Sequence, residues 1–180
     1  FYTDILAKFH NPLTIENDLF KPCGFKVTDI LFYHYHALPP IFEAKDQRGN
    51  TIRLHDYLGK KLVLFFYPKA STPGCTTEAC DLRDNYVLFL AKGFDILGVS
   101  ADSAKKQQSF VEKYELPFPL IADENKEVIQ AFGVWGPKKF MGKEYDGIHR
   151  TTFIIDENSY IEEVISNVKT KEHSSQILGN

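Results

Sequence analysis

The feature of this sequence that most constrains its fold is a short, almost uninterrupted apolar segment. After Lys61 it reads Leu-Val-Leu-Phe-Phe-Tyr, ending at Tyr67, and Pro68 terminates it. A run of this length without alternating polar residues is typical of a strand that is buried on both faces of a sheet. Because helices must cover both faces of such a sheet, the segment favours an α/β protein.

A helix with clear start and stop signals follows this segment. Thr72 is a suitable N-cap, Pro73 belongs in a first helical turn, and Gly93 stops the helix after residue 91. Apolar side chains recur in it at steps of three and four residues, which predicts one buried face. The same kinds of signal predict a hairpin of 41–44 and 51–54, strands at 94–100, 118–122, 151–155 and 160–165, and helices at 103–114, 125–132 and 173–178.

The order of these elements predicts the architecture. A strand–helix–strand unit followed by a closing hairpin gives a mixed sheet. We therefore expect an α/β, thioredoxin-like fold in which helices flank a mixed central sheet. The 180 residues suffice for one such domain, which we place at 38–180, and residues 1–37 have weaker periodicity and are expected to form an N-terminal extension.

The extension contains two features that require an interpretation. Its single cysteine, Cys23, is interpreted as a bystander. The cluster Phe32-Tyr33-His34-Tyr35-His36 is interpreted as an apolar packing segment. A histidine metal site is the alternative, although carboxylate or cysteine ligands at a matching spacing are not evident nearby.

Composition excludes several classes of partner. A net charge of -3 gives no electrostatic reason to expect binding to nucleic acid or an anionic membrane. No apolar stretch approaches the ~20 residues of a membrane span, and the first residues lack the basic start and apolar core of a signal peptide. Three cysteines are too few, and the wrong parity, for a disulfide scaffold. We therefore expect a protein of the reducing cytoplasm.

Two cysteines mark the junction between the apolar strand and the helix. Cys75 lies in the first helical turn, the electropositive end where a thiolate is favoured, and Cys80 follows five residues later. For a thiol in general, lowering the pKa from ~8.5 to ~6 gains only about twofold in reactivity at pH 7, because the thiolate also becomes a weaker nucleophile. A thiol that reduces peroxides therefore also needs donors directed at the peroxide oxygens.

The sequence supplies candidates for these donors. Thr72 lies three residues before the first cysteine of the pair, and Gly74 permits a close turn beside free backbone N–H groups. Arg150 precedes a predicted strand, and its fixed fork of donors suits two oxygens better than a lysine. Glu78, one turn into the helix, is placed to hold that arginine. Arg83 is interpreted as a surface charge.

At this point the residues carry a resemblance to a known family. Pro68, Thr72 and Cys75 stand as Pro-x-x-x-Thr-x-x-Cys, which resembles the active-site loop of peroxiredoxins. The full run from Phe-Tyr-Pro-Lys to Glu-Ala-Cys (66–80), and the stretch 132–150, are similar to the bacterioferritin comigratory protein or peroxiredoxin Q branch of that family. The resemblance covers about residues 38–178.

The resemblance implies a thioredoxin fold and a thiol-dependent peroxidase that reduces hydrogen peroxide and organic hydroperoxides. It implies that Cys75 is the peroxidatic cysteine and Cys80 the resolving cysteine of the same chain. Thr72 and Arg150 would bind the peroxide, and Pro68 would shield the pocket. Thioredoxin is the expected reductant, and no metal, haem or flavin is expected. An internal resolving cysteine needs no partner subunit, so a monomer is expected.

Two other functions remain open from the residues alone. A thiol-disulfide oxidoreductase is possible on the same fold, although its usual Cys-x-x-Cys is absent. A non-catalytic metal-binding or chaperone module could use Cys75, Cys80 and the histidines His34 and His36, but the ligand spacing is poor. Peroxide consumption by metal-free protein separates the last of these from the peroxidase.

Overall fold

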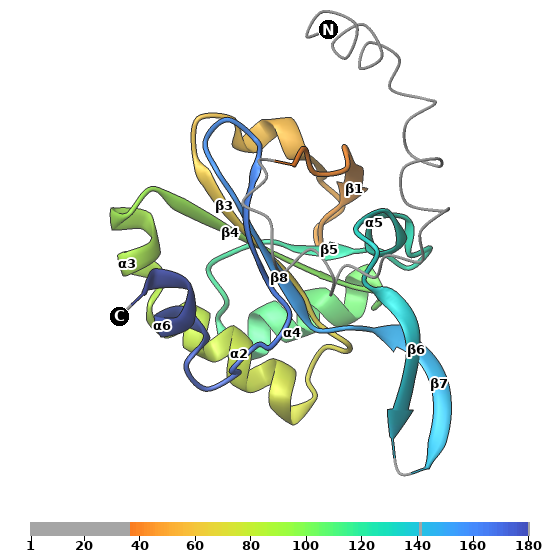
Figure 1. Ribbon diagram of the computed structural model, residues 1–180. Helices are drawn as coiled ribbons and strands as arrows, with labels where there is room; N and C mark the ends of the chain where they lie inside the picture. Colours follow the sequence, from red (N-terminus) through yellow and green to blue (C-terminus); the bar gives the residue numbers. More distant parts are fainter. Residues whose placement is uncertain (1–36, 141, 180) are drawn as a thin grey trace, which may run out of the picture. The chain divides into compact units, whose positions relative to one another are not determined.

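The computed structural model describes residues 37–140 and 142–179, which belong to the compact unit His34–Asn180 (Figure 1). The predicted extension up to residue 36, with Cys23 and the cluster 32–36, lies outside the described residues. Ala37, the last residue of the predicted extension 1–37, is described. Its carbonyl oxygen accepts a 2.8 Å hydrogen bond from the backbone N–H of Ile161.

A five-stranded mixed sheet forms the centre of this unit, in the order β5-β4-β3-β8-β9. The predicted apolar strand is β3 (Lys61–Phe66), which pairs in parallel with β4 (Phe94–Ser100). β4 in turn pairs in parallel with β5 (Leu120–Ala122). On the other side of β3, β8 (Thr151–Ile155) and β9 (Ile161–Ile165) add antiparallel strands. The predicted mixed sheet with a central buried strand is confirmed.

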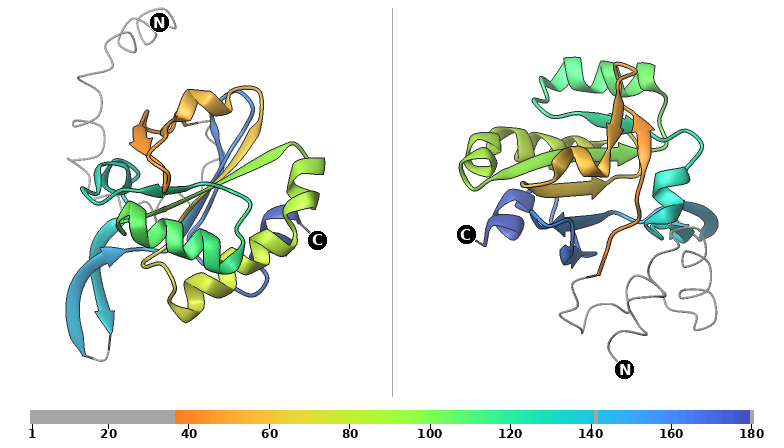
Figure 2. Two further views of the ribbon diagram at one scale, coloured as in Figure 1. Left: turned by 180° about the vertical axis from the view of Figure 1, so that it is seen from behind. Right: turned by 90° about the horizontal axis from the view of Figure 1, so that it is seen from above.

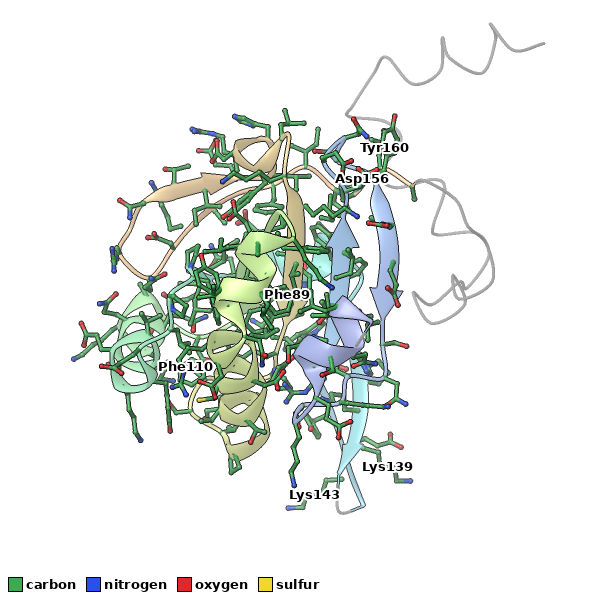
Figure 3. The ribbon with its side chains drawn as sticks, turned by 90° about the vertical axis from the view of Figure 1, so that its left-hand side faces the viewer. Phe89, Phe110, Lys139, Lys143, Asp156 and Tyr160 are labelled. Carbon is green, nitrogen blue, oxygen red and sulfur yellow. The ribbon has the colours of Figure 1, made fainter. Side chains whose placement is uncertain are left out.

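The alternation of side chains along β3 explains why its sequence is apolar from Leu62 onward. Val63, Phe65 and Tyr67 face one layer of helices, where they pack with the core residues of the helices, among them Phe89 and Phe110 (Figure 3). The helices of this core are α2 (Pro73–Asp84), α3 (Tyr86–Ala91), α4 (Ala104–Tyr114) and α6 (His173–Leu178).

The opposite face of the sheet is covered differently (Figures 1 and 2). There Phe66 packs against Phe132 and Phe153, and Phe132 also meets Phe42. Phe132 directly follows the short helix α5 (Glu127–Ala131). The elements on this side are α5 and the predicted hairpin, now β1 (Glu43–Lys45) and β2 (Thr51–Arg53).

Three local features differ from the sequence-based expectation. The helix predicted as one piece ends at Asp84 and restarts as α3; at this junction the Asp81 carbonyl accepts hydrogen bonds from both the side chain of Asn85 (2.9 Å) and its backbone N–H (3.3 Å). A 3-10 turn, η3 (Leu54–Tyr57), was not predicted. The hairpin of β6 (Trp135–Phe140) and β7 (Lys143–Ile148) was also missed.

Among the described residues, none of the helices has both the length and the apolar character that crossing a membrane would require.

Candidate active site

The end of β3 and the start of α2 place Cys75. The chain leaves the sheet at Tyr67, and α2 begins at Pro73, which fits the first helical position because it has no N–H to satisfy. The carbonyl of Thr72 accepts the first helical hydrogen bond, 2.8 Å from the N–H of Thr76. Cys75, the third residue of α2, is 2% exposed and belongs to the hydrophobic core.

A buried polar network fixes the loop that precedes the helix. The Asp102 carboxylate accepts a 2.7 Å hydrogen bond from the N–H of Ala70 and a 2.9 Å hydrogen bond from the Ser100 hydroxyl. The Gln107 amide donates to Ser100 at 2.9 Å, and its oxygen accepts a hydrogen bond from the Tyr67 hydroxyl. Sequence reasoning missed Ser100, Asp102 and Gln107, because they lie on β4, in the loop after it and on α4, and nothing in their spacing links them to the cysteine loop.

Arg150 completes the surroundings of the sulfur. It lies between β7 and β8, and its Nη2 is 3.2 Å from Cys75 Sγ, while its Nη1 forms an ion pair with Glu78 Oε2. A Cβ added to Gly74 would lie 3.5 Å from the same Nη2. This is an ordinary van der Waals contact, so the place of the guanidinium beside the helix does not depend on glycine at this position. The structure thus brings together four residues that the sequence singled out.

Cys75 and Glu78 are more deeply buried than Arg150. Glu78 is fully buried and Arg150 is 20% exposed. Burial raises the pKa of Glu78 to about 7, although Arg150 acts in the opposite direction. For Arg150, burial would lower the pKa, but the negative charges of Glu78 and Cys75 outweigh it and the pKa is raised. A nitrogen of this permanent cation therefore stabilises negative charge on the Cys75 sulfur.

The other predicted site residues lie close in sequence but make different contacts. The Thr72 hydroxyl donates a 2.9 Å hydrogen bond to the backbone oxygen of Lys69 and does not cap the helix. Pro68 is half-buried at the end of β3, and Cys80 is a half-buried free thiol in α2. No hydrogen bond joins Thr72 to Cys75 in the part of the chain that the structure describes.

Two further residues near the site were not predicted. His173 of α6 is fully buried, and its Nε2 lies 3.8 Å from Glu78 Oε1 and 2.8 Å from the Thr152 hydroxyl. Lys138 of β6 donates a 3.0 Å hydrogen bond to the Ile148 carbonyl, and burial followed by the charge of Arg150 lowers its pKa. The only sequence signal for His173 is its place at the start of a helix far from the cysteines, which identifies no partner.

The predicted surface role of Arg83 is partly right. Its guanidinium pairs with the exposed carboxylate of Asp84, but it also donates a 2.8 Å hydrogen bond to the Tyr114 carbonyl. Within residues 37–140 and 142–179, no three His, Cys, Asp or Glu side chains gather in a way that could hold a metal ion. The histidines of the alternative metal site, His34 and His36, lie outside those residues.

The opposite pKa shifts of Glu78 and His173 predict how the pair affects stability. Burial raises the Glu78 pKa from 4.5 to about 7, so its contribution to stability is lost as pH rises through that range. Burial lowers the His173 pKa from 6.5 to about 4, so its contribution is lost as pH falls through that range. The two contributions oppose each other between pH 4.5 and 6.5.

Replacing Glu78 with glutamine should remove the Glu78 contribution. His173 titrates in both proteins, so the difference between them is the Glu78 contribution: between pH 4.5 and 7, the free energy of unfolding should rise by up to about 3 kcal/mol more in the variant than in the wild type. Urea unfolding at half-unit pH steps measures this difference, in which all other titrating groups cancel. Parallel curves for the two proteins would contradict the raised pKa of Glu78.

Comparison with known protein families and relatives gives a consistent result. The AhpC/TSA family profile matches residues 37–164. Peroxiredoxin Bcp of Escherichia coli (strain K12) is 47% identical over 141 residues, which cover 78% of this chain and 90% of the relative.

Solved structures extend the similarity to the fold. Peroxiredoxin Q of Xanthomonas campestris superposes with a TM-score of 0.74 at 33% identity, covering 81% of this chain and 96% of that one. The bacterioferritin comigratory protein of the same organism, solved as trapped intermediate and ligand complexes to study its alkyl peroxide reduction activity, gives a TM-score of 0.73 at 33% identity. That match covers 79% of this chain and 95% of the other.

Proposed function

Because this chain belongs to the AhpC/TSA family, among the thiol-dependent peroxidases of its Bcp and peroxiredoxin Q group, we propose that Cys75 is the sulfur that peroxide oxidises. The distance of 3.2 Å between Arg150 Nη2 and Cys75 Sγ supports this assignment most directly. Stopped-flow measurement of peroxide consumption tests it, with Cys75→Ser as the inactive control.

In the proposed first step, the Cys75 thiolate attacks one peroxide oxygen. A sulfur–oxygen bond forms, the oxygen–oxygen bond breaks, and the departing hydroxide or alkoxide takes a proton and leaves as water or alcohol. Cys75 becomes a sulfenic acid. Hydrogen peroxide and organic hydroperoxides both supply the required bond.

The donors around the sulfur act on the charge that develops on the departing oxygen. Arg150 Nη2 already lies at the sulfur, and the first N–H groups of α2 have no acceptor within the helix. Since the Thr72 hydroxyl has one hydrogen and gives it to Lys69, it can only accept a hydrogen bond from the peroxide O–H. Pro68 is proposed to shield this pocket from water.

Cys80 is proposed to resolve the sulfenic acid as an internal disulfide. Its sulfur attacks the Cys75 sulfur, and the departing hydroxide is protonated to water. Both residues lie in α2, where five residues correspond to a rise of ~7.5 Å and a rotation of ~140°. A disulfide needs Cα atoms within about 7 Å and converging side chains. The helix therefore has to unwind between the two cysteines.

Oxidation is expected to expose the backbone of residues 76–81 to solvent while the end of α2 stays in place. Leu82 and Phe89 are fully buried and hold the following segment in the core. Amide hydrogen exchange should show a loss of protection at 76–81 in the oxidised protein and little change at Phe89. Equal protection of 76–81 in the two redox states would contradict the proposed disulfide.

The remaining parts of the cycle concern partners. Peroxiredoxins act on peroxides and are reduced by thiol proteins. Thioredoxin is proposed as the reductant here, since the internal disulfide is a substrate for dithiol exchange. The cycle requires no second subunit, so a monomer is proposed. The catalytic domain is proposed to span residues 38–180.

A further inference from the structure

The C-terminal helix α6 is joined to α2 by a charged hydrogen bond (Figure 1). The backbone N–H of Ser174, the second residue of α6, donates to Asp81 Oδ2 at 2.6 Å. The N-cap residue of α6, Glu172, makes no side-chain capping bond of its own. Asp81 therefore satisfies an N–H group in the first turn of α6 that its own helix leaves unpaired.

Asp81 lies at the boundary of the segment that has to unwind. It follows Cys80 directly, and its carbonyl oxygen accepts the hydrogen bond from the Asn85 side chain that closes α2. On one side of it lies the stretch between the two cysteines. On the other side lies Leu82, which is fully buried in the core.

The residue before Ser174 reinforces this connection. His173 is fully buried, and its ring lies 3.8 Å from Glu78 Oε1, which accepts no hydrogen bond from the described residues. Glu78 lies within the stretch that unwinds, so α6 contacts both that stretch and its boundary. When residues 76–81 leave the helix, Glu78 and Asp81 have to separate from α6.

We propose that Asp81 and Ser174 form a latch between α2 and α6 that sets how long the oxidised sulfur of Cys75 waits for Cys80. This inference rests on the proposed function of the two cysteines. Asp81 is a positioning residue, because it contacts neither the sulfur nor the peroxide. The latch holds α2 in its helical form and so opposes the resolving step.

The waiting time matters because the sulfenic acid has two competing fates. Attack by Cys80 gives the disulfide and water. Attack of the ionised sulfenic acid on a second hydrogen peroxide gives a sulfinate and one water, which removes the enzyme from the cycle. A latch that slows the first reaction leaves the second unchanged. Asp81 would therefore determine the peroxide concentration at which the enzyme is over-oxidised.

Removing the latch should accelerate disulfide formation by about fivefold in Asp81→Ala, as expected for the loss of one capping acceptor. The fraction of Cys75 that becomes sulfinate at a given hydrogen peroxide concentration should fall about fivefold. Asp81→Asn keeps an acceptor oxygen without the charge, so its effect should be intermediate. The rate of the first oxidation of Cys75 should not change.

Asp84→Ala is the matched control. Asp84 is an aspartate of the same helix, but it is exposed and pairs only with Arg83 among the described residues. Rapid quenching after mixing with hydrogen peroxide, followed by alkylation and mass spectrometry, measures thiol, disulfide and sulfinate at Cys75. Amide exchange of reduced protein at residues 76–80 should be faster in Asp81→Ala than in Asp84→Ala.

The outcomes separate the latch from a purely structural role. If the contact persists after residues 76–81 unwind, its loss in Asp81→Ala would lower the unfolding temperature without changing the rate of disulfide formation. That result would overturn the inference. The same acceleration in Asp84→Ala would also overturn it. Failure of the proposed function is distinguishable, because Cys75 would then carry neither sulfenic acid nor disulfide in any of the variants.

Discussion

Replacing Arg150 with methionine is expected to lower the second-order rate constant for oxidation of Cys75 by hydrogen peroxide by about 100-fold. Loss of one donor directed at developing charge typically has an effect of about 10²–10³. Arg150 uses one nitrogen for Cys75 and the other for Glu78, so its position depends on both contacts. Stopped-flow kinetics of the first turnover measures the rate constant.

Lysine at the same position should recover only part of the loss. It restores the charge but presents a single nitrogen, which cannot contact the carboxylate and the sulfur in the geometry of a guanidinium fork. The methionine variant leaves Glu78 without its cation in a buried position, but burial already raises the pKa of this carboxyl to about 7. Glu78 can therefore take a proton instead of remaining a buried unpaired charge.

Arg83 provides the matched control for this prediction. It is a second arginine near α2 whose contacts are Asp84 and the Tyr114 carbonyl, not the sulfur. Arg83→Met should keep the rate constant within about twofold of the wild type. A rate for Arg150→Met within threefold of the wild type, or an equal loss in Arg83→Met, would show that the guanidinium at the sulfur is not what promotes the reaction.

Replacing Cys80 with serine is expected to separate the two halves of the cycle. The first oxidation of Cys75 should proceed at the rate of the wild type, because the contacts of Cys75 do not involve Cys80. Steady-state turnover with thioredoxin should fall by more than about tenfold, because no internal disulfide forms for thioredoxin to reduce. A single-turnover experiment and a thioredoxin-coupled assay on the same variant measure the two rates.

Cys23→Ser serves as the control for the second cysteine. Its sequence position gave no reason to assign it a role, so turnover of that variant should equal that of the wild type. Undiminished steady-state turnover in Cys80→Ser, together with a loss in Cys23→Ser, would identify Cys23 as the resolving thiol instead.

The parts of the fold that the sequence predicted are those with a strong local pattern. The apolar run of β3 identified the centre of the sheet, because both faces of that strand are covered and every position after Lys61 is apolar. Strand β4 and helix α6 were predicted with the bounds that the structure has. Their limits are set by neighbouring residues, such as Gly93 before β4.

The features that were missed depend on contacts with distant residues or on weak patterns. The β6–β7 hairpin had a signal in Gly142, whose φ of +79° suits a tight turn, but its strands are largely polar and lack the usual alternation. At the break, the Asn85 side chain bonds to the backbone four residues earlier. Helix periodicity does not reveal such a contact.

The candidate site shows the same division. The position of Cys75 at the start of a helix followed from its neighbours in sequence. The predicted proximity of Arg150 and Glu78 is present in the structure, although 72 residues separate them. The Thr72 hydroxyl bonds to the Lys69 carbonyl, which the sequence did not indicate. The contacts of Asp81 with Ser174 and of His173 with Glu78 had no sequence signal either, because they depend on how α2 and α6 pack.

The identity of the sulfur that reacts first decides whether Cys75 is the residue that peroxide oxidises. Reduced protein is mixed with one equivalent of hydrogen peroxide, alkylated at once and digested for mass spectrometry. We expect the product to contain a bond between Cys75 and Cys80, with sulfenic acid at Cys75 in the Cys80→Ser variant. Recovery of Cys75 as an intact thiol, with the oxidation on another residue, would contradict this expectation.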